Sequence, residues 1–328
     1  MVRTETVLAL VLASACAEDP CSRVTCVEEL PWSGPGSTEA AGEDLARYAC
    51  GGPVLDGPEE VYRVVLTEEG FLATEATAAG TRPLHVMLLD ALSEQACLDG
   101  GEARAGALLP AGEYHLVVDS EAGAAGDYQL RIGFTTAPDL EAQGIQRSAA
   151  EDALSVFDTA WRARESRRLD YVITDFSLHS SLERQWIFDL AGEELLFHLH
   201  VAHGRGFNEP FVETAYPPGF SNTPETHLSS LGLMISGEPY TGAYGSSHRI
   251  DGLEPDLNDN VRDRAIVMHP WEGSRPEFVA SHGEVQPTWG CPALDDRVAP
   301  RVAERLSGGV LMFFWHPQWR EQSHYLAP

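Results

Sequence analysis

The chain has 328 residues, in which 50 acidic residues outnumber 22 basic ones and give a formal net charge of −28 at pH 7. This balance argues against a nucleic-acid-binding protein, which needs a basic surface, and against a protein held mainly by anionic lipids. All basic residues are arginines, which excludes Schiff-base lysine chemistry and phosphate loops that end in Gly-Lys-Ser/Thr. The length suits two domains of ordinary size.

The N-terminus carries a short apolar run, VLALVLASA, at residues 7–15. A membrane-spanning helix needs about 20 residues, so we interpret residues 1–15 as a secretory signal peptide; the alternative is a short apolar strand. The next residues fit a signal-peptidase site and resemble a bacterial lipobox that would lipidate Cys16, although Ala13 stands where Leu is usual. We therefore expect an exported protein of the periplasm or cell envelope, attached to a membrane only through Cys16.

The sequence has six cysteines: Cys16, Cys21, Cys26, Cys50, Cys97 and Cys291. Export permits disulfides, and with Cys16 set aside, the four cysteines from Cys21 to Cys97 allow three connectivities. We favour Cys21–Cys26 and Cys50–Cys97, because the first two are close in sequence. Cys291 then remains a free thiol. If Cys16 is retained unmodified, three bridges become conceivable.

The N-terminal half predicts a small all-β module. Residues 16–49 are rich in Pro, Gly, Glu and Ala, which is typical of a tether. Apolar residues then alternate at 61–66, 84–89, 114–118 and 128–132, with Gly-bearing turns between them, and predict a β-sandwich over residues 50–136. The hairpin LPAGEYHLVV at residues 109–118 resembles the prepeptidase-C-terminal β-sandwich modules of secreted bacterial proteins. This resemblance implies a spacer or binding module.

The C-terminal half predicts a second, β-rich domain with a few helices. Residues 137–147 are expected to be a linker, and residues 148–164 a helix with a capping box formed by Ser148 and Glu151. Apolar segments at 171–176, 185–190, 195–201, 231–235, 265–268 and 310–315 predict strands, and residues 295–306 a helix. The predicted fold is therefore mainly β, with the second domain over residues 148–328.

His269 and Cys291 form the main candidate for catalysis. His269 ends an apolar strand, and Cys291 follows 22 positions later in the motif Thr288-Trp289-Gly290-Cys291. A thiol attacks a carbonyl as the thiolate, which a neighbouring His and a helix N-terminus both favour. Gly290 allows a tight turn that presents backbone amides to an oxyanion.

The spacing from His269 to Thr288-x-Gly290-Cys291 resembles the signature of murein L,D-transpeptidases of the YkuD-related branch. Similar segments occur in order from residue 171 to residue 315. They are DFS at 175–177, RQWIFDL at 184–190, VAHG at 201–204, FSNT at 220–223, SSLG at 229–232, YTG at 240–242, DGL at 251–253 and the stretch 258–269. The resemblance implies that this half of the chain is an L,D-transpeptidase-like catalytic domain.

The resemblance also implies a mechanism and a substrate. Cys291 would form a thioester with a peptidoglycan stem peptide as a terminal D-amino acid leaves, with His269 as the base and a backbone carbonyl as its partner. An amine acceptor would give a cross-link, and water would give a carboxypeptidase. Backbone amides of Gly290 and Cys291 would bind the oxyanion, and Thr288 would orient the site. No cofactor or metal is implied.

Four residues are candidates for substrate contacts: His203, Gly204, Trp289 and Tyr240. The sequence also departs from the family pattern, with Pro270 after the histidine, Pro287 where an Arg-containing segment is usual, and Ala293 after the cysteine motif. An anion-binding role for an arginine at these positions is therefore not carried over.

Two other classes of function remain open. The departures from the pattern also fit a non-catalytic envelope-binding protein with a degenerate site. The segment His198-Leu199-His200-Val201-Ala202-His203 resembles the HxHxDH motif of zinc hydrolases, with Ala in place of Asp; packed strand histidines are the alternative. The acidic run 254–263 is expected to be a solvated loop, with Asn258 and Arg262 as structural residues.

Overall fold

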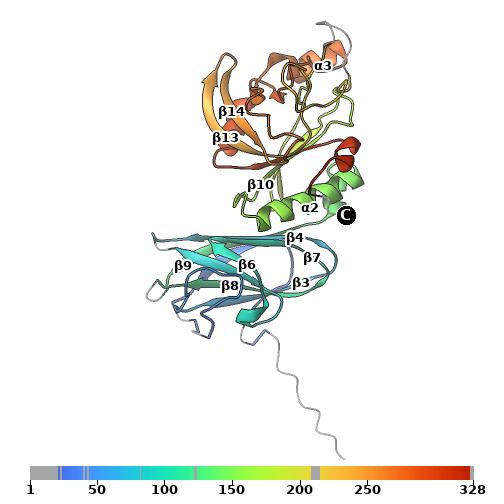
Figure 1. Cartoon of the computed structure of the whole chain (residues 1–328). Helices are drawn as coiled ribbons and strands as arrows, with labels where there is room; N and C mark the ends of the chain where they lie inside the picture. Colours follow the sequence, from blue (N-terminus) through green and yellow to red (C-terminus); the bar gives the residue numbers. More distant parts are fainter. Residues whose placement is uncertain are drawn as a thin grey trace, which may run out of the picture.

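The computed structural model describes residues 21–325, except residues 23, 40, 43, 82, 122–123 and 208–214. The predicted signal peptide and Cys16 lie outside these residues. The described chain forms a β-sandwich followed by a larger, β-rich domain (Figure 1), so the mainly β fold class is confirmed. Within the described residues, no helix is long and apolar enough to cross a membrane.

The β-sandwich consists of two sheets around one apolar core. One sheet has the order β1-β3-β8-β5-β6 and the other the order β2-β9-β4-β7. The strands are β1 (Thr25–Val27), β2 (Trp32–Ser37), β3 (Glu60–Leu66), β4 (Gly70–Ala78), β5 (Leu84–Leu89), β6 (Cys97–Glu102), β7 (Arg104–Leu109), β8 (Gly112–Ser120) and β9 (Asp127–Thr135), with a short 3-10 helix at Glu94–Ala96. All four strands predicted here are present, and their alternating apolar residues face the core.

The predicted tether differs from the structure, because β1 and β2 belong to the sandwich. β2 pairs with β9 at the edge of its sheet, and an edge strand tolerates a proline such as Pro35, whose missing N–H would leave a gap inside a sheet. The disulfides Cys21–Cys26 and Cys50–Cys97 join this region to itself and to β6. These are the pairs that the sequence analysis favoured.

The second domain is built on a sheet with the strand order β12-β11-β10-β17-β13-β14-β15-β16. Its strands are β10 (Asp170–Asp175), β11 (Gln185–Asp189), β12 (Glu194–Leu199), β13 (Gly232–Gly242), β14 (Gly245–Gly252), β15 (Val267–Pro270), β16 (Ala293–Leu294) and β17 (Leu311–Trp315). Its helices are α1 (Ala137–Ala142), α2 (Arg147–Arg162), α3 (Pro276–His282) and α4 (Ala299–Arg305), with 3-10 turns at Glu272–Ser274 and Pro317–Glu321. The central strands β10 and β17 are fully buried and pair in parallel.

The predicted linker and helix cap are wrong in detail. Residues 137–142 form α1, whose capping box joins Thr136 and Asp139, because each side chain accepts from the other residue's backbone N–H. The next helix, α2, begins at Arg147 and has no side-chain cap, so Ser148 and Glu151 lie inside it.

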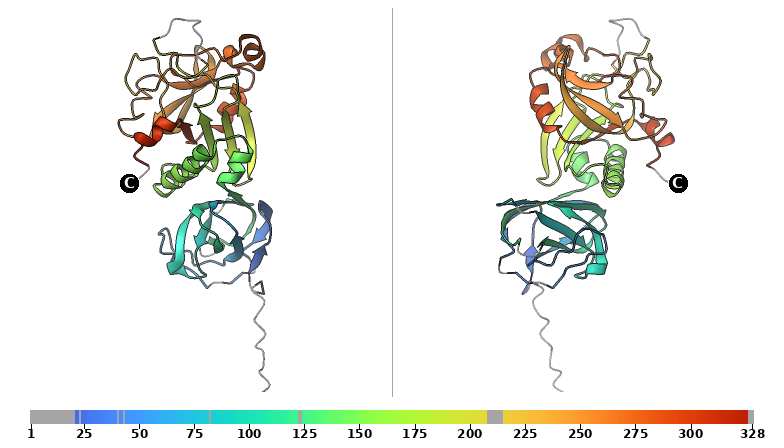
Figure 2. Two further views of the ribbon diagram at one scale, coloured as in Figure 1. Left: turned by 90° about the vertical axis from the view of Figure 1, so that its right-hand side faces the viewer. Right: turned by 60° about the vertical axis from the view of Figure 1, so that its left-hand side comes forward.

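The two domains share an apolar interface along α2, which lies between the sandwich and the second sheet (Figures 1 and 2). The centroid of the Phe157 ring on α2 lies 4.9 Å from that of Phe71 on β4 and 4.7 Å from that of Tyr171 on β10. Phe71 and Ala73 therefore belong to the apolar cluster of the second domain rather than to that of the sandwich. A side chain in place of Gly133 of β9 would collide with the carbonyl of Leu190.

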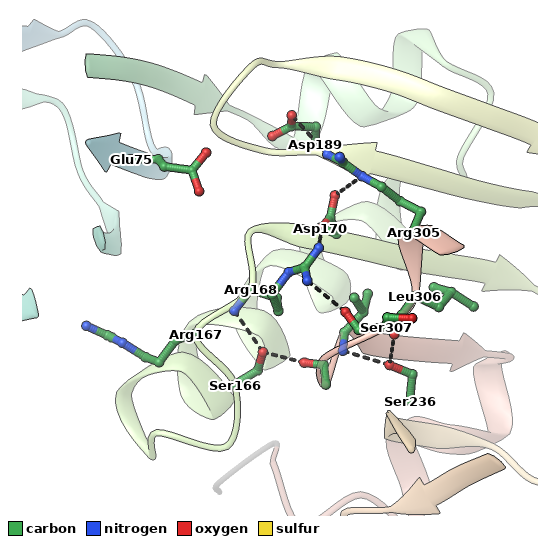
Figure 3. A network of polar contacts seen from close by, with 12 residues as sticks. Glu75, Ser166, Arg167, Arg168, Asp170, Asp189, Ser236, Arg305, Leu306 and Ser307 are labelled. Atoms are coloured by element: carbon green, nitrogen blue, oxygen red, sulfur yellow. Dashed lines mark hydrogen bonds and ion pairs between the residues drawn. The ribbon is translucent and has the colours of Figure 1, made fainter. Parts of the chain in front are cut away.

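Ion pairs extend this interface beyond the apolar contacts. Arg131 of β9 pairs with Asp189 of β11 at 2.5 Å and with Glu75 of β4 at 3.0 Å. Arg305 of α4 pairs with Asp189 at 3.2 Å and with Asp170 at 2.6 Å. Figure 3 shows that Asp189 and Asp170 lie side by side, with Arg305 between them. One buried acidic residue, Asp189, thus connects the sandwich to the last helix of the second domain.

Candidate active site

Cys291 follows a backbone turn that only glycine can make. Gly290 has φ +114°, and a Cβ there would lie 2.6 Å from Ile266 Cδ1 and 2.7 Å from the carbonyl oxygen of Leu228. The positive φ and this lack of space both require glycine. The turn places Cys291 on the wall of a cleft of about 920 Å³, which also includes His269.

The Cys291 sulfur lies against the backbone that leads into β15. The N–H of Val267 donates to Sγ at 3.5 Å, and Sγ lies 3.8 Å from the carbonyl oxygen of Ala265. Cys291 is the free cysteine among the described residues. Burial raises the pKa of its thiol, while the Val267 N–H and the charge of Arg264 act in the opposite direction.

His269 lies on β15, next to the strand that follows Cys291. The register pairs His269 with Ala293 of β16 in parallel. Its Nδ1 lies 2.9 Å from the carbonyl oxygen of Pro270, which can only accept, so Nδ1 carries the proton and Nε2 of the neutral ring is the basic nitrogen. Burial lowers the pKa of His269.

The raised pKa of Cys291 and the lowered pKa of His269 both favour the uncharged forms of these side chains before the reaction begins. Burial disfavours the thiolate of Cys291 and the imidazolium of His269 alike, because each ion loses hydration. The described contacts contain no direct hydrogen bond between the two side chains, and such bonds often tighten only when substrate binds. A neutral thiol beside a neutral imidazole would require His269 to remove the thiol proton as the reaction begins.

The helix predicted to begin just after Cys291 is displaced. Ala293 and Leu294 are extended because they pair with β15, and α4 begins only at Ala299. The expectation that a helix N-terminus stabilises the Cys291 thiolate is therefore wrong.

Thr288 fixes the turn that carries Cys291. Its hydroxyl lies 2.7 Å from the carbonyl oxygen of Cys291 and accepts the N–H of Gly290 at 3.2 Å. Its own N–H donates to the carbonyl oxygen of His203 at 2.8 Å. The Gly290 amide is thus engaged with Thr288 in this structure, whereas the sequence analysis expected it to face an oxyanion.

Aromatic and charged side chains line the rest of the cleft. The Tyr244 ring, which is 56% exposed, stacks on His269 with ring centroids 4.4 Å apart. The Trp289 ring, 63% exposed, stacks on His227 at the same centroid distance. The charged lining residues are Arg205, Glu225, Asp263, Arg264 and Glu284. This mixture suits a ligand that has both polar groups and apolar faces.

Of the four predicted substrate residues, only Trp289 is among the described residues that line the cleft. His203 is fully buried, with Nδ1 2.6 Å from the guanidinium of Arg184. Gly204 is bridged to Thr288 through the backbone, and Tyr240 lies under the guanidinium of Arg249 on the β13–β14 hairpin. His203 and Gly204 support the Thr288 turn from behind instead of facing the cleft.

The three histidines of the zinc alternative do not converge. His198 stacks on Trp186 with centroids 4.8 Å apart, while His203 faces Arg184 in the interior. A guanidinium beside an imidazole nitrogen disfavours a cation there. Among the described residues, no group of three or more His, Cys, Asp or Glu side chains is arranged to hold a metal ion.

The sequence analysis did not identify several residues of the cleft, among them Arg264 and Tyr244. Arg264 lies directly between the run 254–263, which was expected to be a solvated loop, and the strand predicted at 265–268 that leads to His269. This position could have identified it. Tyr244 reaches His269 through the β13–β14 hairpin, and a pairing between distant segments leaves no local signal.

A family profile described as L,D-transpeptidase catalytic domain (YkuD_2) matches residues 141–315, which is more than half of the chain. The chain therefore belongs to the YkuD-type L,D-transpeptidase family, and the resemblance seen in its motifs is confirmed. At the level of the family, this indicates an acyltransferase that acts on peptidoglycan. A search of curated proteins found no match.

Solved structures show only weak similarity. The chain is similar to the pre-peptidase C-terminal domain of a collagenase from Bacillus anthracis, with 16% identity and a TM-score of 0.26 over 33% of this chain and 93% of that domain. It is also similar to the helical cell shape determining protein Pgp2 from Campylobacter jejuni, with 15% identity and a TM-score of 0.29 over 49% of this chain and 54% of that protein. Similarities of this strength carry no argument about this chain.

Proposed function

We propose that this chain is a cysteine L,D-transpeptidase that forms a thioester between Cys291 and a peptidoglycan stem peptide. The observation that carries the proposal is the convergence of Cys291 and His269 on one cleft, with the Pro270 carbonyl holding Nδ1 so that Nε2 is the base. Membership of the L,D-transpeptidase family supports the same reaction.

The reaction follows from this arrangement. His269 Nε2 takes the thiol proton, and the thiolate of Cys291 attacks the carbonyl of the diamino-acid residue. The C–N bond breaks, the imidazolium gives its proton to the departing amine, and a D-amino acid leaves. An amine of a second stem then attacks the thioester and loses a proton to His269, which returns it to the sulfur. Water in place of this amine gives hydrolysis.

A direct test uses the purified chain and disaccharide tetrapeptides. We expect released D-alanine and 3→3-linked dimers from the wild type and neither product from Cys291→Ala, because the thioester cannot form. A carbapenem should add to the wild type with one-to-one stoichiometry by intact mass, and not to Cys291→Ala.

Two outcomes would overturn this function. Activity of Cys291→Ala equal to that of the wild type would exclude the thioester. A folded wild type whose thiol stays inert towards both the tetrapeptide and the carbapenem would indicate the non-catalytic envelope-binding protein instead, for which the departures at Pro270 and Pro287 would be the reason.

We further propose that the chain is exported and lipid-anchored through Cys16. The apolar run at residues 7–15 and the lipobox-like residues before Cys16 support this, as do the two disulfides, which persist in oxidising compartments. The mass of the mature protein checks it: an N-terminus at Cys16 with attached acyl chains is expected, whereas an unmodified Cys16 would exclude the anchor.

A further inference from the structure

Arg264 is a cleft residue whose guanidinium, in the described part of the chain, is bound by uncharged acceptors. Its guanidinium donates to the carbonyl oxygen of Ser221, to the Ser230 hydroxyl at 2.7 Å, to the Leu228 carbonyl oxygen at 2.6 Å and to the Thr226 hydroxyl at 3.3 Å. All of these acceptors are uncharged. Among the described contacts of Arg264, there is no carboxylate.

Arg262, two residues earlier, shows the contrast. Its guanidinium pairs with Asp251 and Glu238 on the surface, away from the cleft lining. In a chain with a net charge of −28, acidic partners are abundant. The hydrogen bonds of Arg264 therefore fix the position of its guanidinium but leave its charge available to another anion.

The backbone next to Arg264 leads directly to the Cys291 sulfur. Ala265, the next residue, has φ +55°, and its carbonyl oxygen lies 3.8 Å from Sγ. The Leu228 carbonyl that accepts from Arg264 is also the one against which Gly290 packs, since a Cβ on Gly290 would lie 2.7 Å from its oxygen. Arg264 and Cys291 thus occupy one wall of the cleft.

The charge of Arg264 acts on this sulfur. Burial raises the pKa of Cys291, and the positive charge of Arg264 opposes this rise. The acidic lining residues Glu225, Asp263 and Glu284 would act in the opposite direction, because like charges disfavour an anion.

We propose that Arg264 is a positioning residue for the reaction, and that its guanidinium stabilises the Cys291 thiolate formed when His269 removes the thiol proton. The proton passes from Sγ to Nε2, and Arg264 exchanges none. The role of this step in acyl transfer rests on the proposed function, but the acidity of the thiol can be measured without turnover.

The test measures the rate at which iodoacetamide alkylates Cys291 as a function of pH in the full chain, with the modified peptide identified by mass spectrometry. We expect the midpoint in Arg264→Gln to lie about one pH unit above that of the wild type, which corresponds to about tenfold slower alkylation below the midpoint. Arg264→Lys keeps the charge and should stay near the wild type. Arg262→Gln is the matched control and should leave the midpoint unchanged.

Circular dichroism establishes that each variant is folded. An unchanged midpoint in folded Arg264→Gln would overturn the proposal, as would a midpoint in Arg264→Lys as high as in Arg264→Gln, because that result would assign Arg264 a purely structural role. If Arg264→Gln does not fold, Arg264→Lys decides: a midpoint near the wild type supports the charge effect, and a raised midpoint contradicts it. An Arg264-dependent midpoint without peptidoglycan turnover would refute the proposed function alone.

Discussion

Replacing His269 with glutamine lowers the rate of Cys291 acylation by about 10²–10⁴-fold, the range by which a positioned acid–base group accelerates proton transfer. Glutamine can still donate an N–H to the carbonyl oxygen of Pro270, but it has no basic nitrogen to take the thiol proton. Single-turnover acylation by a tetrapeptide, followed by intact mass, measures the effect.

The pH profile gives the same variant a second readout. Because burial lowers the pKa of His269, the ring stays unprotonated to lower pH than an ordinary histidine, so the acidic limb of the wild-type profile should lie below the usual range. His269→Gln should lose this limb. The matched control is His198→Gln, which changes a histidine stacked on Trp186 outside the cleft and should retain full activity. Acylation by His269→Gln at the wild-type rate would remove His269 from the mechanism.

Replacing Asp99 with alanine lowers the free energy of unfolding by about 1–3 kcal/mol, the usual cost of leaving buried hydrogen-bond donors without an acceptor. Asp99 of β6 is 4% exposed. Its carboxylate accepts the indole N–H of Trp161 at 2.8 Å and pairs with Arg164 at 3.0 Å and Arg167 at 3.6 Å. Alanine leaves these donors without their acceptor at the domain interface. Urea unfolding measures the change in the free energy of unfolding.

Two controls bracket this prediction. Asp99→Asn keeps one carbonyl acceptor for Trp161 and should be less destabilising than Asp99→Ala. Glu151→Ala breaks an exposed pair with Arg147 on α2 and should change stability by less than about 0.5 kcal/mol. A loss below about 1 kcal/mol in Asp99→Ala would show that the interface does not depend on this carboxylate.

Local patterning was enough to predict much of the fold. The strands with regular alternation or continuous apolar runs, such as β3 and β17, were found. β4 was missed because its core-facing positions include the small residues Ala73 and Ala76, and β2 because its Pro and Gly are typical of a linker. The cap of α2 was predicted from Ser148, but that helix begins at Arg147 without a side-chain cap, and the capping box lies on α1.

The candidate active site likewise contains residues that a local motif predicts and residues that it does not. His269 and Cys291 were predicted from a motif whose spacing is visible in one stretch of sequence. The supports of the site come from elsewhere, because distant segments fold onto it. Glu254, expected in a solvated loop, is fully buried and accepts from the Leu233 N–H at 2.7 Å and the Trp319 indole at 2.9 Å. An acidic run in the sequence does not show which of its carboxylates is buried, because the hydrogen-bond donors come from segments distant in the sequence.

The interface along α2 determines whether the two domains can be separated into stable fragments. The family match begins at residue 141, yet Phe71 and Ala73 of the sandwich complete the apolar cluster that α2 shares with β10, and Arg131 reaches Asp189. A fragment cut at the family boundary would expose Phe157 and Trp161 to water. The two domains are therefore not independent modules. Exchange of either domain for a homologous one would also require compatible side chains on the surface that contacts α2 and Asp189.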